Sequence, residues 1–575
     1  MRGTELSTLR RWLIIGLVLI PVFIGALDLT IVSAILPEVL VRLNIPVDTA
    51  HLQLVSWAVT GYLLAYTVSM MVMSRISDMV GRRRVYFICL AIFIAGSWWV
   101  ATANDGPTAL FNQIARQYFH QRIDLSQLTL GAVILGRVIQ ALGAGAMVPV
   151  SLALVGDLFP PARRAQPIGL IGAIDTMGWV LGHLYGGLMV DLFNKHGNDI
   201  VTALRSIGVN TAPPDWHTLF YLNVPIGLIA MALTWWALRG VAHPVARGRF
   251  DLGGATLIAV ALIALNIGLG GGNSDVTAST SLQSLNESAL PLNPPLLVGG
   301  ALCFAIFLIW EWRRPDPLID LHLFRKRNVA GASLTNLAIG FCLMLGLVSV
   351  PLLTNLRVEH VSMGEIATAA ARSGILLSGL TIPMALAAVP GGELANRIGY
   401  RLTVMIGLGL AVIGFVLAGL TWSATSSEIL MGAEIVVVGI GLGLTISPIG
   451  TAVINDADES QRGVASALVI ILRLVGMTLA ISSLLTFALA RVNYLFDIAK
   501  STFAPNLTAD QLQYQSELAY QSVAIHVIGE MLLIGAAVCV LALIPAAFLR
   551  GGALEKPEQA VKPSYDQEPR PTPGR

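Results

Sequence analysis

The chain has 575 residues, of which 55% are hydrophobic and 12% are charged, and its formal net charge is +2. Soluble domains carry about 25% charged and about 45–50% apolar residues, so this chain has too little polar surface for a water-soluble globule of its length. The composition excludes a soluble enzyme, a disordered chain and a nucleic-acid-binding protein, which would need a basic patch. We therefore expect a protein whose surrounding solvent is lipid.

Apolar runs long enough to cross a membrane recur along the whole chain. A helix needs about 20 mostly apolar residues to span a hydrocarbon core of about 30 Å, and open strand edges cannot be satisfied in lipid, so each run is predicted to be a helix. The first seven runs lie near 12–36, 52–73, 85–103, 128–152, 167–190, 218–239 and 252–271. The second seven lie near 294–312, 329–355, 373–391, 402–422, 429–452, 464–489 and 522–549. The sequence thus predicts an all-α polytopic membrane protein with 14 transmembrane helices.

The basic residues predict the orientation. If the N-terminus lies inside, the inner segments hold 25 of the 36 Lys and Arg residues and the outer segments hold 9, while Arg137 and Arg473 fall within spans. Basic residues concentrate in cytoplasmic loops. We therefore predict a multi-pass protein of the inner or plasma membrane with both termini in the cytoplasm.

Long outer connections interrupt this pattern. Segments near 104–127, 191–217, 272–293 and 490–521 are polar and rich in turn residues. They are expected either to form ordered lids or to be solvated insertions. The tail 551–575 is rich in Pro and balanced in charge, which predicts disorder.

Two inner loops are similar to each other. Residues 74–84 read SRISDMVGRRR and residues 391–401 read GGELANRIGYR. Gly permits a tight reversal between helices, and the charged side chains complement helix ends. A repeat of this kind indicates two bundles around a central site, and the alternative is a solvated rim. The residues predicted to form a conformational gating loop are Asp78, Gly81, Arg82, Arg83, Asn396, Gly399 and Arg401.

Several motifs, taken in chain order, resemble those of the major facilitator superfamily, and within it the fourteen-span drug:proton antiporter branch. The segment 74–84 is similar to the superfamily signature after span two, with Ser74 where Gly is usual. Further similarities lie in the first, fourth, sixth and thirteenth spans, at residues 27–37, 137–149, 216–227 and 463–476. The resemblance extends from about residue 12 to residue 480.

This resemblance implies the major-facilitator fold and alternating access by rocking of two bundles. The implied domains are an N-terminal six-helix bundle (1–240), two additional central helices with linkers (241–328), a C-terminal six-helix bundle (329–550) and the tail (551–575). The implied function is proton-coupled export of hydrophobic or cationic small molecules such as drugs. The alternative is a dedicated exporter of a lipid or natural-product metabolite.

The expected partners are a small-molecule substrate, protons and the lipid bilayer, with no nucleic acid, and an accessory protein outside the membrane is left open. The nine His are scattered and the four Cys lie within apolar runs, without metal-ligand spacing. No Gly-x-Ser-x-Gly or phosphate-binding loop occurs, so the sequence predicts neither an enzyme nor a bound cofactor or metal.

The fifth span is rich in glycine. The antiporter motif of the family contains Gly-Pro followed closely by Gly-Gly, and here His183 takes the place of Pro. Glycines four residues apart form a ridge that another helix can approach closely. The residues of this predicted helix-packing motif are Gly178, Gly182, His183, Gly186 and Gly187.

Ionisable residues inside the spans are the candidates for proton coupling or substrate binding. An ionised side chain at mid-bilayer costs roughly 2.5–3.5 kcal/mol on insertion scales, so such residues pair or line a wet cavity. The candidates are Asp28, Arg137, Asp175, Glu434, Arg473, His526 and Glu530.

Three of these candidates carry specific hypotheses. Asp28 lies sixteen residues into the first run, about 24 Å from its inner end, and is either a coupling carboxylate or a structural partner. Arg137 needs an anion or several acceptors, as a control on proton movement or as a packing clamp. Asp175 lies about 20° from Gly182 around the helix, so we expect it on the glycine ridge. If that ridge packs bundle against bundle, protonation of Asp175 would bias one access state.

The remaining candidates leave alternatives open. Arg473 either acts as Arg137 does, in the second half of the chain, or pairs structurally. His526 and Glu530 are four residues apart on one helix face, where they either relay protons or lie near the outer surface with the histidine capping the carboxylate. Glu434 lies about one and a half turns inside its span, is expected to snorkel outward and is a weak candidate for recognising cations.

Overall fold

The computed structural model describes residues 7–43, 49–119, 124–206, 208, 212–241, 250–268, 293–357, 363–504 and 508–552, and within them all regular structure is helical. Thirteen helical segments are long and apolar enough to cross a membrane, and Leu252–Leu265 forms a shorter apolar helix. Each of the fourteen predicted runs therefore falls on a helix. The long elements of the first half are α1 (Thr8–Arg42), α2 (Thr49–Val80), α3 (Arg82–Ala101), α4 (Gly106–Ile114), α5 (Leu125–Ala144), α6 (Met147–Leu158), α7 (Ala165–Ser206) and α8 (Trp216–Ala237).

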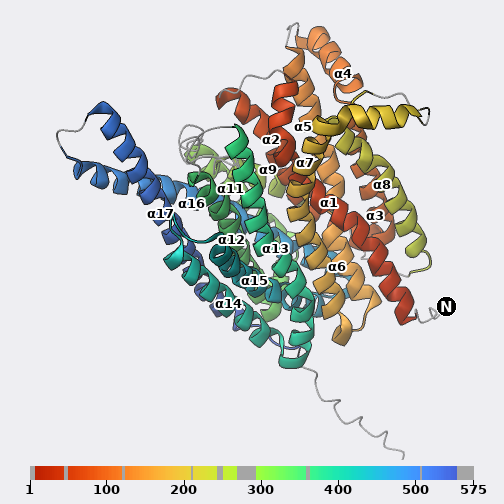
Figure 1. Cartoon of the computed structure of the whole chain (residues 1–575). Coiled ribbons are helices and arrows are strands. Elements are labelled where there is room, and N and C mark those ends of the chain that lie inside the picture. The colour runs from red at the N-terminus through yellow and green to blue at the C-terminus, as the bar shows by residue number, and fades with distance from the viewer. Residues whose placement is uncertain are drawn as a thin grey trace, which may run out of the picture.

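The second half repeats the arrangement of the first (Figure 1). Its long elements are α12 (Arg327–Leu356), α13 (Met363–Ile398), α14 (Tyr400–Thr421), α15 (Glu428–Asp456), α16 (Arg462–Ser501) and α17 (Ala509–Ala546). In the first half α1 packs on α7 and α8, and α5 packs on α2 and α3; in the second half α12 packs on α16 and α17, and α15 packs on α13 and α14. The halves meet mainly through α7 on α13 and α2 on α16, which are equivalent pairs. The internal repeat in the sequence is thus a repeat of helix pairings.

The similar loops are both tight reversals. Gly81 separates α2 from α3 and Gly399 separates α13 from α14, with φ of 105° and 92°. Side chains other than glycine are strained at such φ values. The last described residues lie beside the second loop, where the Tyr400 amide donates to the carbonyl of Gly551 at 3.0 Å. Following the charge-based orientation, we call the end of the molecule that carries Gly81 and Gly399 the inner end.

Three of the four outer segments that we expected to be connecting loops contain helix. Segment 104–127 contains α4 and a π-helical turn (Ala115–Phe119), α7 continues to Ser206, and α16 and α17 leave only 502–508 between them. These segments lack the long apolar run that marks a membrane span, and many of their polar residues also favour helix. The start of α17 has a capping box between Thr508 and Gln511, which satisfies backbone amides of the first turn. Segment 272–292 and the tail from residue 553 lie outside the described residues.

Helices α16 and α17 form a long outer hairpin. With 40 and 38 residues they are about 60 and 57 Å long, nearly twice the thickness of a hydrocarbon core of about 30 Å. Because α16 starts at the inner end, we infer from these lengths that the far ends of both helices extend beyond the hydrocarbon core on the opposite side. Figure 1 shows the two helices as a blue hairpin that projects from the bundles.

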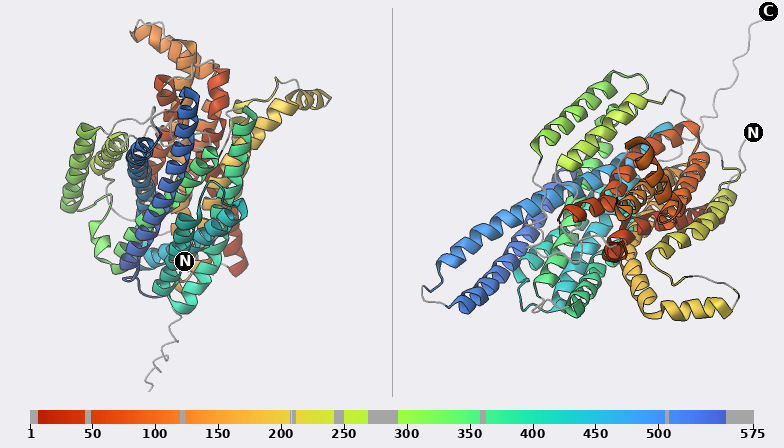
Figure 2. Two further views of the ribbon diagram at one scale, coloured as in Figure 1. Left: turned by 60° about the vertical axis from the view of Figure 1, so that its left-hand side comes forward. Right: turned by 90° about the horizontal axis from the view of Figure 1, so that it is seen from above.

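The two additional helices, α9 (Leu252–Gly268) and α11 (Pro294–Arg313), form a hairpin beside the bundles (Figure 2). They pack on each other, and α9 also packs on α2. Their inner ends are tied by the Trp310 indole, which donates to Asp251 at 2.9 Å. Glu311 of α11 accepts from the Ile319 amide of the connection that follows, at 2.9 Å. The pair thus attaches to the side of the molecule.

Candidate functional site

A buried polar network occupies the core of the first half. Arg137 on α5 forms an ion pair with the Asp28 carboxylate on α1, and its Nη2 donates to the Asp28 carbonyl at 3.0 Å. The second carboxylate oxygen of Asp28 accepts from Asn223 Nδ2 of α8 at 2.8 Å. Gln140 accepts from Arg137 at 2.6 Å and donates to Ser97 on α3 at 2.8 Å. Because the side chains of Asp28, Arg137 and Gln140 have no exposed surface, any change of charge here must be compensated within the network.

Two tyrosines of α2 adjoin this network and were not singled out in the sequence. The guanidinium carbon of Arg137 lies 4.0 Å from the centre of the Tyr62 ring, and the Tyr62 and Tyr66 rings stack with centroids 5.9 Å apart. A cation over an aromatic face is attracted by the ring quadrupole. Their spacing of four residues on an apolar helix is a weak signal of such a stack.

A second ion pair joins the two halves. Arg473 Nη2 on α16 donates to Asp175 Oδ2 on α7 at 3.0 Å, and both side chains are buried. Asp175 lies ten residues after the start of α7 and Arg473 eleven residues after the start of α16, so the pair sits about 15 Å from the inner end, near mid-bilayer. Asp175 and Arg473, which the sequence analysis treats as separate candidates, therefore face each other across the interface between the halves.

The glycine ridge is closely approached by another helix, as predicted, and that helix belongs to the same half. A Cβ at Gly178 would lie 2.5 Å from Ala26 Cβ, and one at Gly182 would lie 2.3 Å from the Leu27 carbonyl, so the ridge contacts α1 within the same half. The hypothesis that this ridge packs bundle against bundle is therefore wrong, although Asp175 does face the other half. A Cβ at Gly187 would meet open space, and the His183 side chain lies outside the described residues.

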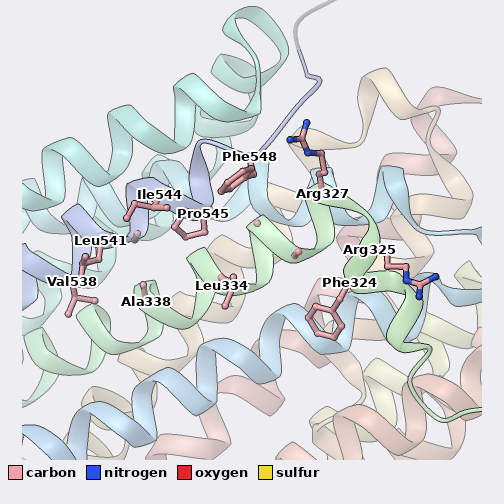
Figure 3. A pocket seen from close by; sticks show the side chains of 13 residues that line it. Phe324, Arg325, Arg327, Leu334, Ala338, Val538, Leu541, Ile544, Pro545 and Phe548 are labelled. Atoms are coloured by element: carbon pink, nitrogen blue, oxygen red, sulfur yellow. The ribbon is translucent and has the colours of Figure 1, made fainter. Parts of the chain in front are cut away.

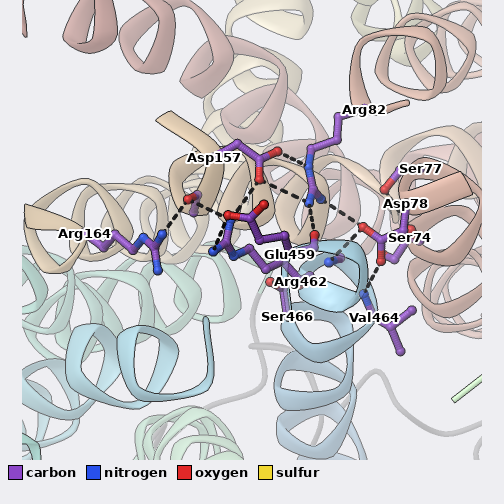
Figure 4. Close-up of polar contacts among 12 residues, drawn as sticks. Ser74, Ser77, Asp78, Arg82, Asp157, Arg164, Glu459, Arg462, Val464 and Ser466 are labelled. Carbon is purple, nitrogen blue, oxygen red and sulfur yellow. Dashed lines mark hydrogen bonds and ion pairs between the residues drawn. The ribbon is translucent and has the colours of Figure 1, made fainter. Parts of the chain in front are cut away.

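Asp78 and Arg82 of the predicted gating loop belong to a cluster of polar contacts between the halves at the inner end (Figure 4). We call this cluster the inner gate. The Asp78 carboxylate accepts from the amides of Gly463 and Val464, both at 3.2 Å. These amides belong to the first turn of α16, where a helix carries partial positive charge. Arg82 lies 3.1 Å from Asp78 and forms an ion pair with Asp157 of α6. A carboxylate of the first half thus holds the start of a helix of the second half.

Basic residues complete the inner gate. Arg462 Nη1 donates to Asp157 at 3.2 Å and to the Gly156 carbonyl at 3.1 Å. Arg164 donates to Asn455 on α15 at 2.8 Å. Burial and the neighbouring Arg462 lower the pKa of Arg164 to about 10, which still leaves it cationic at neutral pH. The gate therefore combines carboxylates of the first half with arginines of both halves.

Close backbone contacts lie beside this gate. Ser447 on α15 donates to the Ala165 carbonyl at 2.5 Å, and a Cβ at Gly169 would lie 2.5 Å from the Ala388 carbonyl on α13. The polar contacts between the halves, as far as the structure describes them, cluster from this inner end to the pair of Asp175 and Arg473. The inner side of the molecule is therefore closed in this conformation.

The second loop of the repeat makes no equivalent lock among the described residues. Arg397 pairs with Glu393 on its own helix, and Arg401 is exposed. Asn396 is half-buried and, as an amide, carries no charge with which to bind a helix start. In the first loop, Arg83 instead lies 3.8 Å over the Trp235 ring, which ties α3 to α8. The two loops share their turn but differ in their contacts.

Substitution Gly463→Ala is expected to open the inner gate. A Cβ at this position would lie 2.7 and 2.9 Å from the two Asp78 carboxylate oxygens, so the carboxylate has to leave the amides. In a variant without native cysteines, a cysteine introduced at the buried Ser74 reports opening through labelling by a maleimide from the inner side. We expect several-fold faster labelling than in the parent chain. Gly409→Ala is the matched control because a Cβ there meets open space, and equal rates in both variants would contradict this prediction.

Glu434 does not snorkel outward. It is buried, and its carboxylate accepts from Thr421 Oγ1 at 2.7 Å and from the Trp422 indole at 2.9 Å. These contacts close the end of α14 onto α15. The expectation that Glu434 snorkels outward is therefore wrong, because the helix turns this face toward its neighbour.

Substitution Glu434→Ala is accordingly expected to destabilise the protein and to leave its proton dependence unchanged. The Trp422 indole would stay buried without its acceptor, at a cost of about 1–3 kcal/mol. Thermal unfolding of the purified protein should show a lower Tm. Glu428→Ala, at the exposed start of the same helix, is the control. A normal Tm together with an altered pH profile of transport would speak for a coupling role instead.

Glu530 and His526 lie toward the outer hairpin. Glu530 forms a two-pronged ion pair with Arg491 of α16, both contacts at 2.9 Å, while the His526 ring is mostly exposed 3.4 Å from the carboxylate. Glu530 therefore already has a permanently charged partner in Arg491. The ion pair ties α16 to α17. With His526 mostly exposed, this geometry favours a histidine that caps the carboxylate near the surface over a buried proton relay.

The fold and site define a polytopic membrane transporter, in which two repeated bundles enclose buried ion pairs and close at one end. The sequence model of the Major Facilitator Superfamily matches residues 18–481. The chain therefore belongs to the Major Facilitator Superfamily, and it is a transporter rather than an enzyme.

Relatives and solved structures agree with this assignment. A triacylglyceride transporter of Mycobacteroides abscessus is 32% identical over 538 residues, which cover 91% of each chain. A triacylglyceride transporter of Mycobacterium tuberculosis is 30% identical over 560 residues, which cover 95% of each chain. The structure of the human organic anion transporter MFSD10 shares the fold, with a TM-score of 0.54 at 13% identity over 93% of this chain and 99% of that one. The proton:xylose symporter XylE has the same TM-score and identity, over 92% and 95%.

Proposed function

We propose that this protein exports a neutral lipid of the triacylglyceride type in exchange for protons, by alternating access. The proposed cargo rests on the similarity of this chain, over at least nine-tenths of its length, to proteins named triacylglyceride transporters. This favours the lipid exporter over the drug exporter that the motifs placed first. The orientation is proposed as before, with the inner end in the cytoplasm.

The buried ion pairs support proton coupling. The side chains of Asp28 and Asp175 are buried, and each carboxylate forms an ion pair with an arginine, Arg137 and Arg473 respectively. Protonation of a paired carboxylate removes the attraction to its arginine and frees the helices that the pair connects. Asp28 connects α1, α5 and α8 within one half, whereas Asp175 connects the halves. A proton at either carboxylate therefore changes which helices are held together.

The polarity of the site supports a neutral cargo over a cationic one. Each buried acid in the described part of the first half already has an arginine partner, and Glu434 is occupied by two donors. A cationic drug would need an acid that is free to receive it. A triacylglyceride carries no charge and makes no such demand.

The outer hairpin also suits an apolar cargo. Far from the inner end, α16 and α17 expose Tyr494, Ile498, Tyr514 and Leu518. Tyr494 lies 32 residues after the start of α16, about 48 Å along the helix and thus beyond the hydrocarbon core. Apolar side chains exposed outside the membrane offer acyl chains a surface on leaving the bilayer.

Inverted membrane vesicles test the proposal. A fluorescent triacylglyceride and ethidium, a cationic drug, are offered with an imposed proton gradient while proton flux is recorded. We expect gradient-driven movement of the triacylglyceride that a protonophore stops and that ethidium does not inhibit. Gradient-driven movement of ethidium without the lipid would favour the drug exporter. Lipid movement that persists after collapse of the gradient would remove proton coupling.

A further inference from the structure

An apolar groove with two arginines at its end runs along the surface of the second half, away from the ion pairs (Figure 3). It has a cavity volume of about 570 Å³ and lies between α12 and α17. Its thirteen lining residues include eleven apolar ones and no acid: Phe324, Arg325, Arg327, Ala330, Gly331, Leu334, Ala338, Val538, Leu541, Ala542, Ile544, Pro545 and Phe548.

The shape of the groove follows from the sizes of its residues. Small residues form its floor, where a Cβ at Gly331 would lie 2.8 Å from the Pro545 carbonyl, so the two backbones nearly touch. Large residues form its walls, and Leu334, Leu541 and Ile544 are each about 60% exposed, at 57%, 61% and 61%. The groove is therefore a slot with an apolar lining that opens toward the bilayer.

The length of the groove corresponds to one leaflet. From Arg327 to Ala338 the chain advances eleven residues, or about 16 Å of helix, and half of a hydrocarbon core is about 15 Å. The arginines lie at the inner end, at the level of phospholipid headgroups. An acyl chain laid in the slot thus places its headgroup beside them.

The two arginines are available to a ligand. Among the described residues, Arg325 and Arg327 form no ion pair with an acid, and both are exposed; Arg327 only lies near the Phe548 ring, at 5.9 Å. Lys326 between them is used by the protein, since its amine donates to the Asp456 carbonyl at 2.8 Å and lies 3.4 Å from Asp458. Lys326 thus stabilises the fold of the protein itself, whereas Arg325 and Arg327 lie at the end of the groove, where a ligand can reach them.

We propose that this groove binds an anionic phospholipid of the inner leaflet, with the phosphate at Arg325 and Arg327 and an acyl chain along α12 and α17. Guanidinium groups bind phosphate oxygens through paired hydrogen bonds, and basic pockets between membrane helices on the cytoplasmic side suit anionic headgroups. A neutral triacylglyceride leaves both cations without a partner. A second copy of this chain docked face to face would bring like charges together.

Native mass spectrometry of the purified protein with phosphatidylglycerol or phosphatidylcholine of identical acyl chains tests this site. We expect the protein to prefer phosphatidylglycerol, and the double variant Arg325→Gln/Arg327→Gln to bind it roughly tenfold more weakly, close to its affinity for phosphatidylcholine. The control is Arg313→Gln/Arg314→Gln, which removes the same charge from exposed positions at the end of α11 and should keep the preference.

Two further arms locate the acyl chain. Ala338→Phe fills the slot and leaves both arginines, so it should weaken the binding of both lipids. Glycerol phosphate, a headgroup without chains, should not displace phosphatidylglycerol at equal concentration. The site is overturned if the wild-type protein shows no preference for phosphatidylglycerol, or if the Arg325 and Arg327 variant keeps that preference. It is also overturned if the control variant loses as much affinity for phosphatidylglycerol, or if glycerol phosphate competes fully. A change in the amount of dimer, instead of bound lipid, on these substitutions would likewise contradict the proposal. The arginine variant is decisive even if Ala338→Phe fails to fold, because both arginines are exposed.

Discussion

Substitution Asp28→Asn is expected to abolish proton-driven export, lowering the rate about a hundredfold or more. Asparagine takes the place of the carboxylate but cannot bind and release a proton as a carboxyl group does. It also leaves Arg137 as a buried cation without its counter-ion, which costs about 3–5 kcal/mol of stability. Transport in inverted vesicles and thermal unfolding of the purified protein measure the two effects.

A second variant separates the loss of coupling from the loss of stability. The double substitution Asp28→Asn/Arg137→Gln removes both buried charges, so it should regain most of the Tm and remain uncoupled. Asp251→Asn is the control, because Asp251 is a buried carboxylate with an indole partner in the α9 and α11 hairpin, away from the network. Export by Asp28→Asn with the normal dependence on the proton gradient would show that Asp28 only supports the fold.

Substitution Asp175→Ala is expected to open the closed inner side. Arg473 loses the acid that it reaches across the interface, and the interface then holds an unpaired cation. If half or more of the penalty of about 3–5 kcal/mol falls on the closed state, the ratio of closed to open molecules drops by roughly tenfold or more. Maleimide labelling of a cysteine at Ser74, in a variant without native cysteines, should accelerate accordingly.

The exchange of the two charges provides the test of mechanism. Asp175→Arg/Arg473→Asp restores opposite charges at the same depth and should recover closure and part of the transport. Asp175→Asn retains an acceptor for Arg473 without the negative charge, and its export should depend less on the proton gradient. Unchanged proton dependence in Asp175→Asn would remove the coupling role, and a charge exchange as open as the single variant would remove the ion-pair explanation.

The tight loops and the packing of glycine show how far local patterns reach. The turn at Gly81 and Gly399 follows from the repeat, because a one-residue reversal between helices needs a positive φ. Gly178 and Gly182 of α7 signal close approach of a helix, but not which helix, and their partner is α1 of the same half. The outer parts of α7, α16 and α17 were not predicted as helix because polar helices outside the membrane lack the long apolar run that marks a span.

By itself the sequence determined the class of protein, the all-helical fold, the fourteen apolar runs and the family resemblance. These features can be predicted from the sequence because every membrane crossing requires about 20 apolar residues. A charged residue within such an apolar run is therefore easy to recognise. Only the tertiary structure decided which charges meet: Asp28 with Arg137 over 109 positions, Asp175 with Arg473 over 298 and Asp78 with the start of α16 over 385. A buried charge requires a partner, but its own neighbours along the chain do not specify which one, because the pairing depends on how whole helices pack.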